Sequence, residues 1–489
     1  MKITPGPEEL ARYRETGLYK VAPVSCELLA DICTPIQAVR KLKNVSSHCF
    51  LLESAEPQET WGRYTFLGYD PKLSITCSDG EMRVGDLKLK TKNPSEVLRQ
   101  ILAEYRSPRV PGLPPFTGGL TGYFSYDYLN YSEPTARRET EDTEHFQDVD
   151  LMLFDKVIAF DNLRQKIILI ANVRLEEGEA GYHWAERTLE ELRRLITEGE
   201  EARDEPGRLT GEVTPLFEKA EYCAMVEKAR RYIREGDIFQ IVLSNRLSAP
   251  YEGSLLNMYR ILRTVNPSPY MFYFSGTDVE VAGASPETLV KLEDGILHTF
   301  PLAGTRPRGK TQEEDRRLEE ELLRDEKELA EHNMLVDLGR NDLGRISEFG
   351  SVQVESLHQV LRFSHVMHIG STVRGRIRED KDALDAVEAV LPAGTLSGAP
   401  KIRACQLIGE LENNKRGIYG GAIGYIDFAG NMDTCIAIRI AYKKNRKVFI
   451  RSGAGIVYDS VPEKEYEECL NKARAVLSSL EKAGKEIDG

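Results

Sequence analysis

The alternation of apolar and polar positions along the chain predicts a protein built from both strands and helices. Short apolar or alternating runs bounded by turn residues predict strands at residues 49–54, 64–69, 118–127, 151–160, 167–173 and 238–247. Apolar residues spaced three and four apart predict a short polar helix within residues 1–20 and further helices at residues 94–105, 186–196, 219–235, 312–334 and 462–485.

The order of these elements predicts the fold class. Strands and helices do not alternate as they do in parallel α/β proteins, and no repeat of 20–50 residues recurs. We therefore predict an α+β protein with large, mostly antiparallel sheets and surrounding helices. Residues 197–215 are acidic, contain Gly and Pro, and have few apolar side chains, which is typical of a linker. We expect domains at residues 1–200 and 216–489, joined by a linker at residues 201–215.

Composition narrows the classes of function. The 489 residues include 65 Lys and Arg against 78 Asp and Glu, a formal net charge of −13, which argues against a nucleic-acid-binding protein. The longest apolar run, about residues 167–171, is far shorter than the ~20 residues that cross a bilayer. The N-terminal residues do not resemble a secretory signal. The eight cysteines form no Cys-x-x-Cys pair, so we expect buried, reduced thiols in a cytoplasmic protein.

The predicted C-terminal helix places two carboxylates beside its apolar stripe. At 100° per residue, Glu465, Glu468 and Lys472 lie at ~0°, ~300° and ~340°, on one flank of the apolar positions. Carboxylates three residues apart can bind a divalent cation, and a lysine one turn further can meet an anion. The alternative is an ordinary Glu468–Lys472 surface pair, which stabilises a helix by a few tenths of a kcal/mol.

A second pair, Glu328 and Glu331, has the same spacing within the predicted helix at residues 312–334. That helix is so acidic that a solvated face is the simpler explanation for the pair. Gly453-Ala454-Gly455 follows a predicted strand, where backbone N–H groups can converge on a carboxylate, and a tight strand bend is the alternative.

Three histidines, His358, His365 and His368, are a weak candidate for a zinc site. Residues 366–370 resemble a strand, in which His365 and His368 would point to opposite faces. One catalytic or hydrogen-bonding histidine is the better interpretation. The segment 302–309 offers a hydroxyl, two arginines and backbone donors, but it lacks the Gly-Lys-Ser/Thr ending of a P-loop.

Several of these segments belong to one ordered series of motifs. In chain order they are LLES (51–54), GDIFQIVLS (236–244), SPE (285–287), PLAGTR (301–306), EHNMLVDLGRND (331–342), AGTLSGAPK (393–401), IYGG (418–421), DTCIAIR (433–439) and GAG (453–455). Together they resemble the chorismate-utilising enzymes, most closely the family of anthranilate synthase component I. The resemblance implies the two-part fold of these enzymes, with the catalytic part at residues 216–489.

The resemblance also implies a Mg²⁺ cofactor and a set of site residues. Glu331 and Glu468 match residues that bind Mg²⁺, with Glu328 and Glu465 supporting them, which suits a cation that prefers a few carboxylates plus waters and substrate oxygens. The implied chorismate contacts are Gly304, Thr305, Tyr419, Arg439, Gly453, Ala454, Gly455 and Lys472. The implied residues beside the reacting ring are Thr395 and His368, and we expect His368 to handle a proton near the leaving group.

Two positions distinguish between relatives. Those that add water to chorismate carry a lysine general base where this chain has Gln240, and glutamine cannot take a proton. Aminodeoxychorismate synthases typically carry a lysine nucleophile at the position of Ala303, where alanine cannot form a covalent intermediate. Both differences favour addition of ammonia to chorismate, loss of the ring hydroxyl and elimination of pyruvate, which gives anthranilate.

Ammonia must come from elsewhere, because no cysteine lies in a glutaminase-type turn. The resemblance therefore implies a separate glutamine amidotransferase subunit in a heterotetramer. It also implies a feedback pocket for L-tryptophan at Ser54, Pro269, Tyr270 and Met271, with two ordinary core strands as the alternative. The rival functions are an aminodeoxychorismate synthase component I, which Ala303 disfavours, and an inactive tryptophan-binding regulator, which the retained charged residues disfavour.

Overall fold

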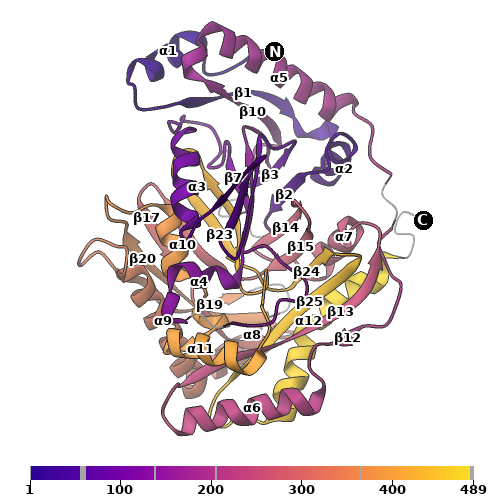
Figure 1. Cartoon of the computed structure of the whole chain (residues 1–489), viewed down its shortest axis with the longest axis vertical. Helices are drawn as coiled ribbons and strands as arrows, with labels where there is room; N and C mark the ends of the chain where they lie inside the picture. The colour runs from indigo at the N-terminus through magenta and orange to yellow at the C-terminus, as the bar shows by residue number, and fades with distance from the viewer. Residues whose placement is uncertain (1, 56–61, 137–138, 204–205, 363–365, 485–489) are drawn as a thin grey trace.

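Two large sheets make up the centre of the molecule (Figure 1). The computed structural model describes residues 2–55, 62–136, 139–203, 206–362 and 366–484. The first sheet has 13 strands: β1 (Val21–Leu29), β10 (Lys166–Arg174), β9 (Lys156–Asp161), β3 (Tyr64–Tyr69), β2 (Cys49–Glu53), β14 (Tyr270–Ser275), β15 (Glu280–Ser285), β24 (Ile440–Lys444), β25 (Lys447–Ile456), β13 (Gln240–Glu252) and β11 (Arg208–Leu209) in spatial order, with β12 (Thr214–Pro215) and β21 (Gly398–Ala399) also paired to β13.

The second sheet has 12 strands. In spatial order they are β18 (Leu302–Pro307), β20 (Val366–Arg376), β17 (Ile296–Thr299), β16 (Thr288–Glu293), β23 (Met432–Ile436), β22 (Ala422–Asp427), β7 (Gly119–Phe124), β8 (Val149–Phe154), β4 (Leu73–Ser78), β5 (Glu81–Val84) and β6 (Leu87–Lys90), and β19 (Gln353–Arg362) also pairs with β20. Adjacent strands in both sheets run antiparallel. The predicted α+β class with large antiparallel sheets is confirmed.

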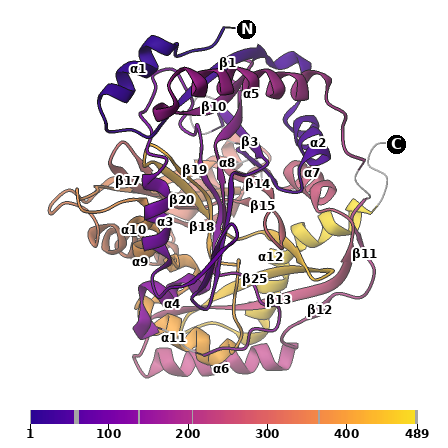
Figure 2. The same ribbon diagram turned by 45° about the horizontal axis from the view of Figure 1, so that its top comes forward.

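Helices cover the outer faces of the sheets. The α-helices are α1 (Pro7–Glu15), α2 (Pro35–Val45), α3 (Pro94–Ala103), α4 (Leu129–Ser132), α5 (Glu179–Glu198), α6 (Lys219–Arg234), α7 (Leu256–Val265), α8 (Gln312–Arg324), α9 (Glu326–Gly344), α10 (Ala383–Val390), α11 (Lys401–Glu412) and α12 (Pro462–Ala483). In the turned view, α1 and α5 lie along one end of the molecule, and α6 and α11 lie at the opposite end (Figure 2). None of the helices in the described part of the chain combines the length and apolarity that a membrane crossing requires.

An aromatic core lies between the two sheets. Phe50 and Phe272 from the first sheet and Phe154 and Ile423 from the second belong to one buried cluster. Their inward positions follow from the two-residue period of strands, which sends alternate side chains to the same face. A second cluster fills the space between the first sheet and helices α2, α5, α7 and α12, and a third packs α9 and α10 on the second sheet.

Two predicted elements are wrong in their extent. The predicted strand at 151–160 is two strands, β8 and β9, which separate at Asp155 and enter different sheets. The predicted helix at 312–334 is two helices, α8 and α9, because the Asp325 side chain accepts hydrogen bonds from the backbone N–H groups of Lys327 and Glu328 and begins a new helix there. The charged pair Asp155-Lys156 marks the first break, and an acidic residue within an acidic helix marks the second.

Both sheets combine strands from the N-terminal and C-terminal parts of the chain. Strand β2 pairs with β14, and β7 pairs with β22. Within the predicted linker, β11 and β12 pair with the long strand β13. The division into domains at 1–200 and 216–489 stays a prediction. All eight cysteines are free, and seven of them are buried, as the sequence predicts; Cys223 is half-buried.

Candidate active site

A cavity of about 740 Å³ collects most of the candidate residues. It is bordered by α9 and β18 on one side and by β13, β25 and α12 on the other. The predicted residues that line it are Gln240, Gly304, Thr305, Glu328, Glu331, His368, Thr395, Tyr419, Arg439, Gly453, Gly455, Glu465, Glu468 and Lys472. Ala454 does not line it, because successive side chains of a strand point to opposite faces and Ala454 packs in the core against α6 and α11.

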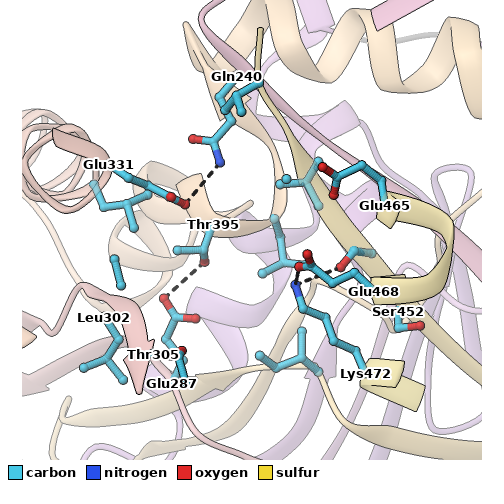
Figure 3. Close-up of a pocket in the computed structure, with 18 of the residues that line it drawn as sticks. Gln240, Glu287, Leu302, Thr305, Glu331, Thr395, Ser452, Glu465, Glu468 and Lys472 are labelled. Atoms are coloured by element: carbon cyan, nitrogen blue, oxygen red, sulfur yellow. Dashed lines mark hydrogen bonds and ion pairs between the residues drawn. The ribbon is translucent and has the colours of Figure 1, made fainter. Parts of the chain in front are cut away.

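The four glutamates reach the cavity from two helices. Figure 3 shows Glu331 on one side of the cavity and Glu465 and Glu468 on the other. Burial, and then the neighbouring carboxylate of Glu328, raise the pKa of Glu331 above its usual value. Burial also raises the pKa of Glu465, with Glu468 adding to the effect. A bound cation would favour the ionised form of these partly buried carboxyl groups.

The Glu468–Lys472 pair that the sequence left open does form. Their side chains make an ion pair of 2.8 Å and are 48% and 51% exposed, but both border the cavity. The Lys472 ammonium also donates to the carbonyl oxygen of Gly453 at 3.1 Å. Within the described part of the chain, no group of three or more His, Cys, Asp or Glu side chains lies close enough together to hold a metal. The two glutamate pairs face each other across open space.

The Gly453–Gly455 segment is not the tight bend that was one interpretation of its sequence. It is regular strand within β25, where Gly453 is opposite Ser244 and Gly455 is opposite Val242 of β13. A Cβ atom at Gly453 would lie 2.9 Å from the Tyr419 hydroxyl, and one at Gly455 would lie 2.8 Å from the Gln240 amide. Both glycines therefore keep the cavity wall open.

Arg439 supplies a cation at the end of the cavity. Its backbone has a φ of 53°, in the left-handed region that a side chain other than glycine rarely adopts. Burial lowers the pKa of its guanidinium, and Glu287 opposes that effect. Strain of this kind is found at functional sites, where the surrounding structure holds a residue in place.

Glu287 is a site residue to which the sequence analysis gave no role, although it belongs to the SPE motif. Its carboxylate accepts a hydrogen bond from the Thr395 hydroxyl at 3.1 Å (Figure 3). Burial raises the pKa of Glu287 to about 7, and the Thr395 hydrogen bond, Arg439 and Lys472 only partly offset that effect. A carboxyl group with a pKa near neutrality can both give and take a proton.

His368 faces the same cavity from β20. Its Nδ1 lies 2.8 Å from the carbonyl oxygen of Gly304 and 3.1 Å from the Thr305 hydroxyl. A carbonyl oxygen only accepts, so Nδ1 carries the hydrogen and Nε2 carries the lone pair when the ring is neutral. Burial lowers the pKa of His368, which favours that neutral ring.

The other two histidines do not support a zinc site. His365 lies outside the described residues. His358 has its Nε2 atom 2.8 Å from the amide oxygen of Asn333, and it is not among the residues that line the cavity with His368.

A second cavity, of about 450 Å³, contains the four candidate regulatory residues. Ser54, Pro269, Tyr270 and Met271 all line it, from the end of β2 and the start of β14. The Tyr270 hydroxyl is 2.9 Å from the hydroxyl of Thr288 and donates to the carboxylate of Asp433 at 2.9 Å. Thr288 is the residue after Glu287, so one hydrogen bond and one peptide unit connect Tyr270 to a residue of the first cavity.

Comparison with known proteins identifies the family. The model of the chorismate binding enzyme family matches residues 47–478. The chain belongs to the chorismate binding enzyme family. A member named anthranilate synthase component 1 from Acetivibrio thermocellus is 46% identical over 478 residues, covering 95% of this chain and 96% of that protein. Its namesake from Aquifex aeolicus is 44% identical and covers 98% of each chain.

Solved structures of the chorismate binding enzyme family agree with the fold. Anthranilate synthase component I from Streptococcus pneumoniae superposes with a TM-score of 0.75 at 38% identity, covering 92% of this chain and 98% of that one. The menaquinone-specific isochorismate synthase from Escherichia coli has a TM-score of 0.69, covering 97% of this chain and 99% of that one. Its identity of 19% means that this second likeness shows the fold alone.

Proposed function

We propose that this chain is the chorismate-converting component of an anthranilate synthase. The reaction joins chorismate and ammonia and yields anthranilate, pyruvate and water. The full-length likeness to proteins named anthranilate synthase component 1 is the observation that carries the proposal. The cavity, which gathers Arg439, Lys472 and two glutamate pairs, supports it, because a dianionic substrate needs cations concentrated locally in a protein whose net charge is −13.

Arg439, Tyr419 and Lys472 bind the substrate in this proposal. The guanidinium and the ammonium meet the carboxylates of chorismate, and the Tyr419 hydroxyl donates to one of them. Gly453 and Gly455 allow close approach of the substrate, since a side chain at either position would collide with Tyr419 or Gln240. Gly304 and Thr305 contact the ring end, next to His368.

The choice of nucleophile depends on Gln240 and Ala303. Neither side chain can act as a base or form a covalent bond, so neither activates water nor attacks the ring. Ammonia carries its own lone pair and needs no such activation. The Gln240 amide lies 3.5 Å from Glu331, at the edge of the cavity, where it can hydrogen-bond the incoming ammonia.

Proton transfer is divided between Glu287 and His368 in this proposal. The C–O bond to the ring hydroxyl breaks more easily when that oxygen receives a proton. Glu287, with a pKa of about 7, holds a proton that it can give to the hydroxyl. His368, neutral and with its lone pair on Nε2, is better suited to accept the proton that the ring loses when pyruvate departs.

The two glutamate pairs fit a Mg²⁺ ion. Carboxylate oxygens are the ligands that Mg²⁺ prefers, and it keeps waters and substrate oxygens in its remaining positions, which suits pairs that face each other across open space. Glu331 and Glu468 would hold the ion, with Glu328 and Glu465 behind them. Bound there, Mg²⁺ would polarise the ring carboxylate of chorismate.

A glutamine amidotransferase and L-tryptophan complete the proposal. The relatives carry the words component 1, which supports a partner component that supplies ammonia, in a heterotetramer. The second cavity would bind tryptophan, with Ser54 at its amino group and Pro269, Tyr270 and Met271 along its indole ring.

The site assignment is tested by steady-state kinetics with chorismate, Mg²⁺ and ammonium. We expect Arg439→Met to raise KM for chorismate by about 100-fold, because a charge-assisted hydrogen bond is lost. Arg378→Met is the matched control, since Arg378 is a half-exposed arginine that pairs with Asp380 and does not line the cavity. Equal kinetics for Arg439→Met and the control would show that this cavity does not bind chorismate.

A further inference from the structure

Three buried charges lie at one wall of the cavity. Glu412, Arg416 and Arg451 have exposed fractions of only 2%, 2% and 1%. One oxygen of Glu412 accepts from Arg416 Nη2 at 2.6 Å, and the other accepts from Arg451 Nη2 at 2.8 Å. The backbone N–H and the hydroxyl of Ser244 also donate to Glu412, at 2.7 and 3.0 Å. We call Glu412, Arg416 and Arg451 the buried charge cluster.

The buried charge cluster is bonded to several segments that frame the cavity. Arg416 Nη1 donates to the carbonyl oxygen of Leu396 at 2.7 Å, next to Thr395, and Arg416 Nη2 donates to that of Val242 at 2.7 Å. Leu396, Val242 and Arg451 all line the cavity. The cluster thus joins β13, β25 and the short 3-10 helix Gly394–Leu396 at one point.

The remaining nitrogens of the two arginines are also satisfied. Arg451 Nη1 donates to the side chain of Asn414 at 2.8 Å, and Arg451 Nε donates to the Ser244 hydroxyl at 2.8 Å. The Arg416 guanidinium lies over the Tyr419 ring, 5.9 Å from its centre. Tyr419, a proposed substrate contact, therefore also rests on the cluster.

Stability alone does not account for this cluster. Removing charges from water is so costly that replacing a whole buried ion pair or triad by apolar residues is often neutral or stabilising. Burial opposes ionisation of Glu412, but Arg416 and Arg451 outweigh it and keep the pKa of Glu412 below its usual value. Glu412 is therefore held in its ionised form and bonded to both guanidinium groups. What they provide that apolar side chains cannot is a fixed geometry, set by directional hydrogen bonds.

We propose that Glu412, Arg416 and Arg451 are positioning residues, which hold Thr395, Tyr419 and the Gly453–Gly455 strand at the spacing that bound chorismate requires. The proposal rests on the proposed function, since chorismate is taken as the ligand. It assigns no chemical step to the cluster, because the charged atoms of Glu412, Arg416 and Arg451 are bonded to one another and to neighbouring protein groups.

The test replaces the whole cluster with Glu412→Met, Arg416→Met and Arg451→Met in one full-length variant. We expect a lower melting temperature, because Ser244, Asn414 and the carbonyl oxygens of Leu396 and Val242 lose their partners. We also expect a kcat/KM for chorismate about 100-fold lower, as small displacements of binding groups cost about that factor. The rise in melting temperature on adding Mg²⁺ should persist, because α9 and α12 carry the glutamates. The matched control is Glu280→Met with Lys443→Met, a 2.9 Å ion pair whose residues do not line this cavity, and it should keep kcat/KM within twofold.

A folded triple variant with wild-type kcat/KM would overturn the proposal while leaving the proposed function intact. If the triple variant does not fold, Arg416→Lys decides. Lysine keeps the charge, but its single nitrogen cannot replace the separate guanidinium nitrogens that bond to Glu412, Leu396 and Val242. We therefore expect kcat/KM to fall about tenfold. A folded Arg416→Lys with unchanged kcat/KM would refute the positioning role. A wild-type chain that does not convert chorismate under any condition would overturn the proposed function itself.

Discussion

Glu287 is the residue on which the proposed chemistry depends most. Its carboxyl group is held by Thr395 and lies near Arg439 and Lys472, yet its pKa stays near 7 because burial outweighs those groups. The folded pKa lies above the usual value of a glutamate, so the proton is present below pH 7 and is lost as the pH rises through 7. A group that must give a proton would therefore lose activity in that direction.

The first prediction concerns the proton of Glu287. At a fixed concentration of free ammonia, kcat/KM for chorismate should fall as the pH rises through about 7, because kcat/KM reports the pKa of a group in the free protein. Glu287→Gln should lower kcat by a factor on the order of 10²–10⁴, the usual contribution of a general acid, with a smaller change in KM. The pH limb near 7 should vanish in this variant. Stopped assays at constant free ammonia measure both effects, and an unchanged limb in Glu287→Gln would assign the proton to another group.

Tyr270 links the two cavities through a hydrogen bond of its hydroxyl group. Its ring lines the second cavity, and its hydroxyl is hydrogen-bonded to Thr288, the neighbour of Glu287.

The second prediction follows from this contact. Tyr270→Phe should keep tryptophan binding within about threefold, because the ring remains, but weaken inhibition of the reaction by about tenfold. Calorimetry measures binding and the assay measures inhibition; a parallel loss of both would mean that Tyr270 only binds the ligand. Met152→Leu, a buried volume-conserving change in the same core cluster, is the control.

The four glutamates proposed to bind Mg²⁺ are carried by two helices, α9 and α12. Each contributes two glutamates at i, i+3, which is the spacing that places both on one helix face. The third prediction is that Mg²⁺ raises the melting temperature of the wild-type chain without any substrate, since a ligand that binds only the folded state stabilises it. Glu331→Gln and Glu468→Gln should each remove that rise, whereas Glu321→Gln on the exposed face of α8 should retain it. A rise that persists in both cavity variants would place the metal elsewhere.

Helix periodicity predicted which residues share a helix face, but it could not predict how the helices are arranged around the cavity. The helix periodicity placed Glu465, Glu468 and Lys472 on one flank, and they border the cavity together. Periodicity could not bring α12 to α9, because their approach depends on pairing between strands far apart in the chain. The break between α8 and α9 was missed because Asp325 acts as a cap within a uniformly acidic stretch. Gly453 and Gly455 were recognised, but only the register with β13 shows that they continue a regular strand.

Glu287 was missed for a different reason. A single glutamate after Ser-Pro has no spacing or periodicity that marks it, and its unusual environment comes from Thr395, Arg439 and burial, which lie far away in the sequence. The buried charge cluster depends on tertiary contacts too: Glu412 and Arg416 are four residues apart, but Arg451 reaches them only when β25 packs beside the end of α11. Local patterns predict elements and some faces, whereas the electrostatics of a site depends on tertiary contacts.

At the scale of the whole molecule, both sheets run through both halves of the chain. Strand β2 pairs with β14, and β7 pairs with β22. Separating the two parts of the chain near residue 205 would therefore expose strand edges in the middle of each sheet. The fourth prediction is that residues 216–489 expressed alone do not fold, and that co-expression with residues 1–203 restores a soluble complex. Circular dichroism and size-exclusion chromatography measure both results. A folded, monomeric fragment 216–489 would show that the two halves are independent units.

Identification of the products would decide whether this chain carries out the proposed reaction. The purified chain would be mixed with chorismate, Mg²⁺ and ¹⁵N-labelled ammonium at mildly alkaline pH, and the products analysed by mass spectrometry. We predict ¹⁵N-anthranilate and pyruvate in equal amounts, with both lost when a chelator is added. Isochorismate, or a product that carries the amino group at the ring carbon of the lost hydroxyl and keeps the enolpyruvyl group, would contradict the roles given to Gln240 and Ala303 and, with them, the proposed function.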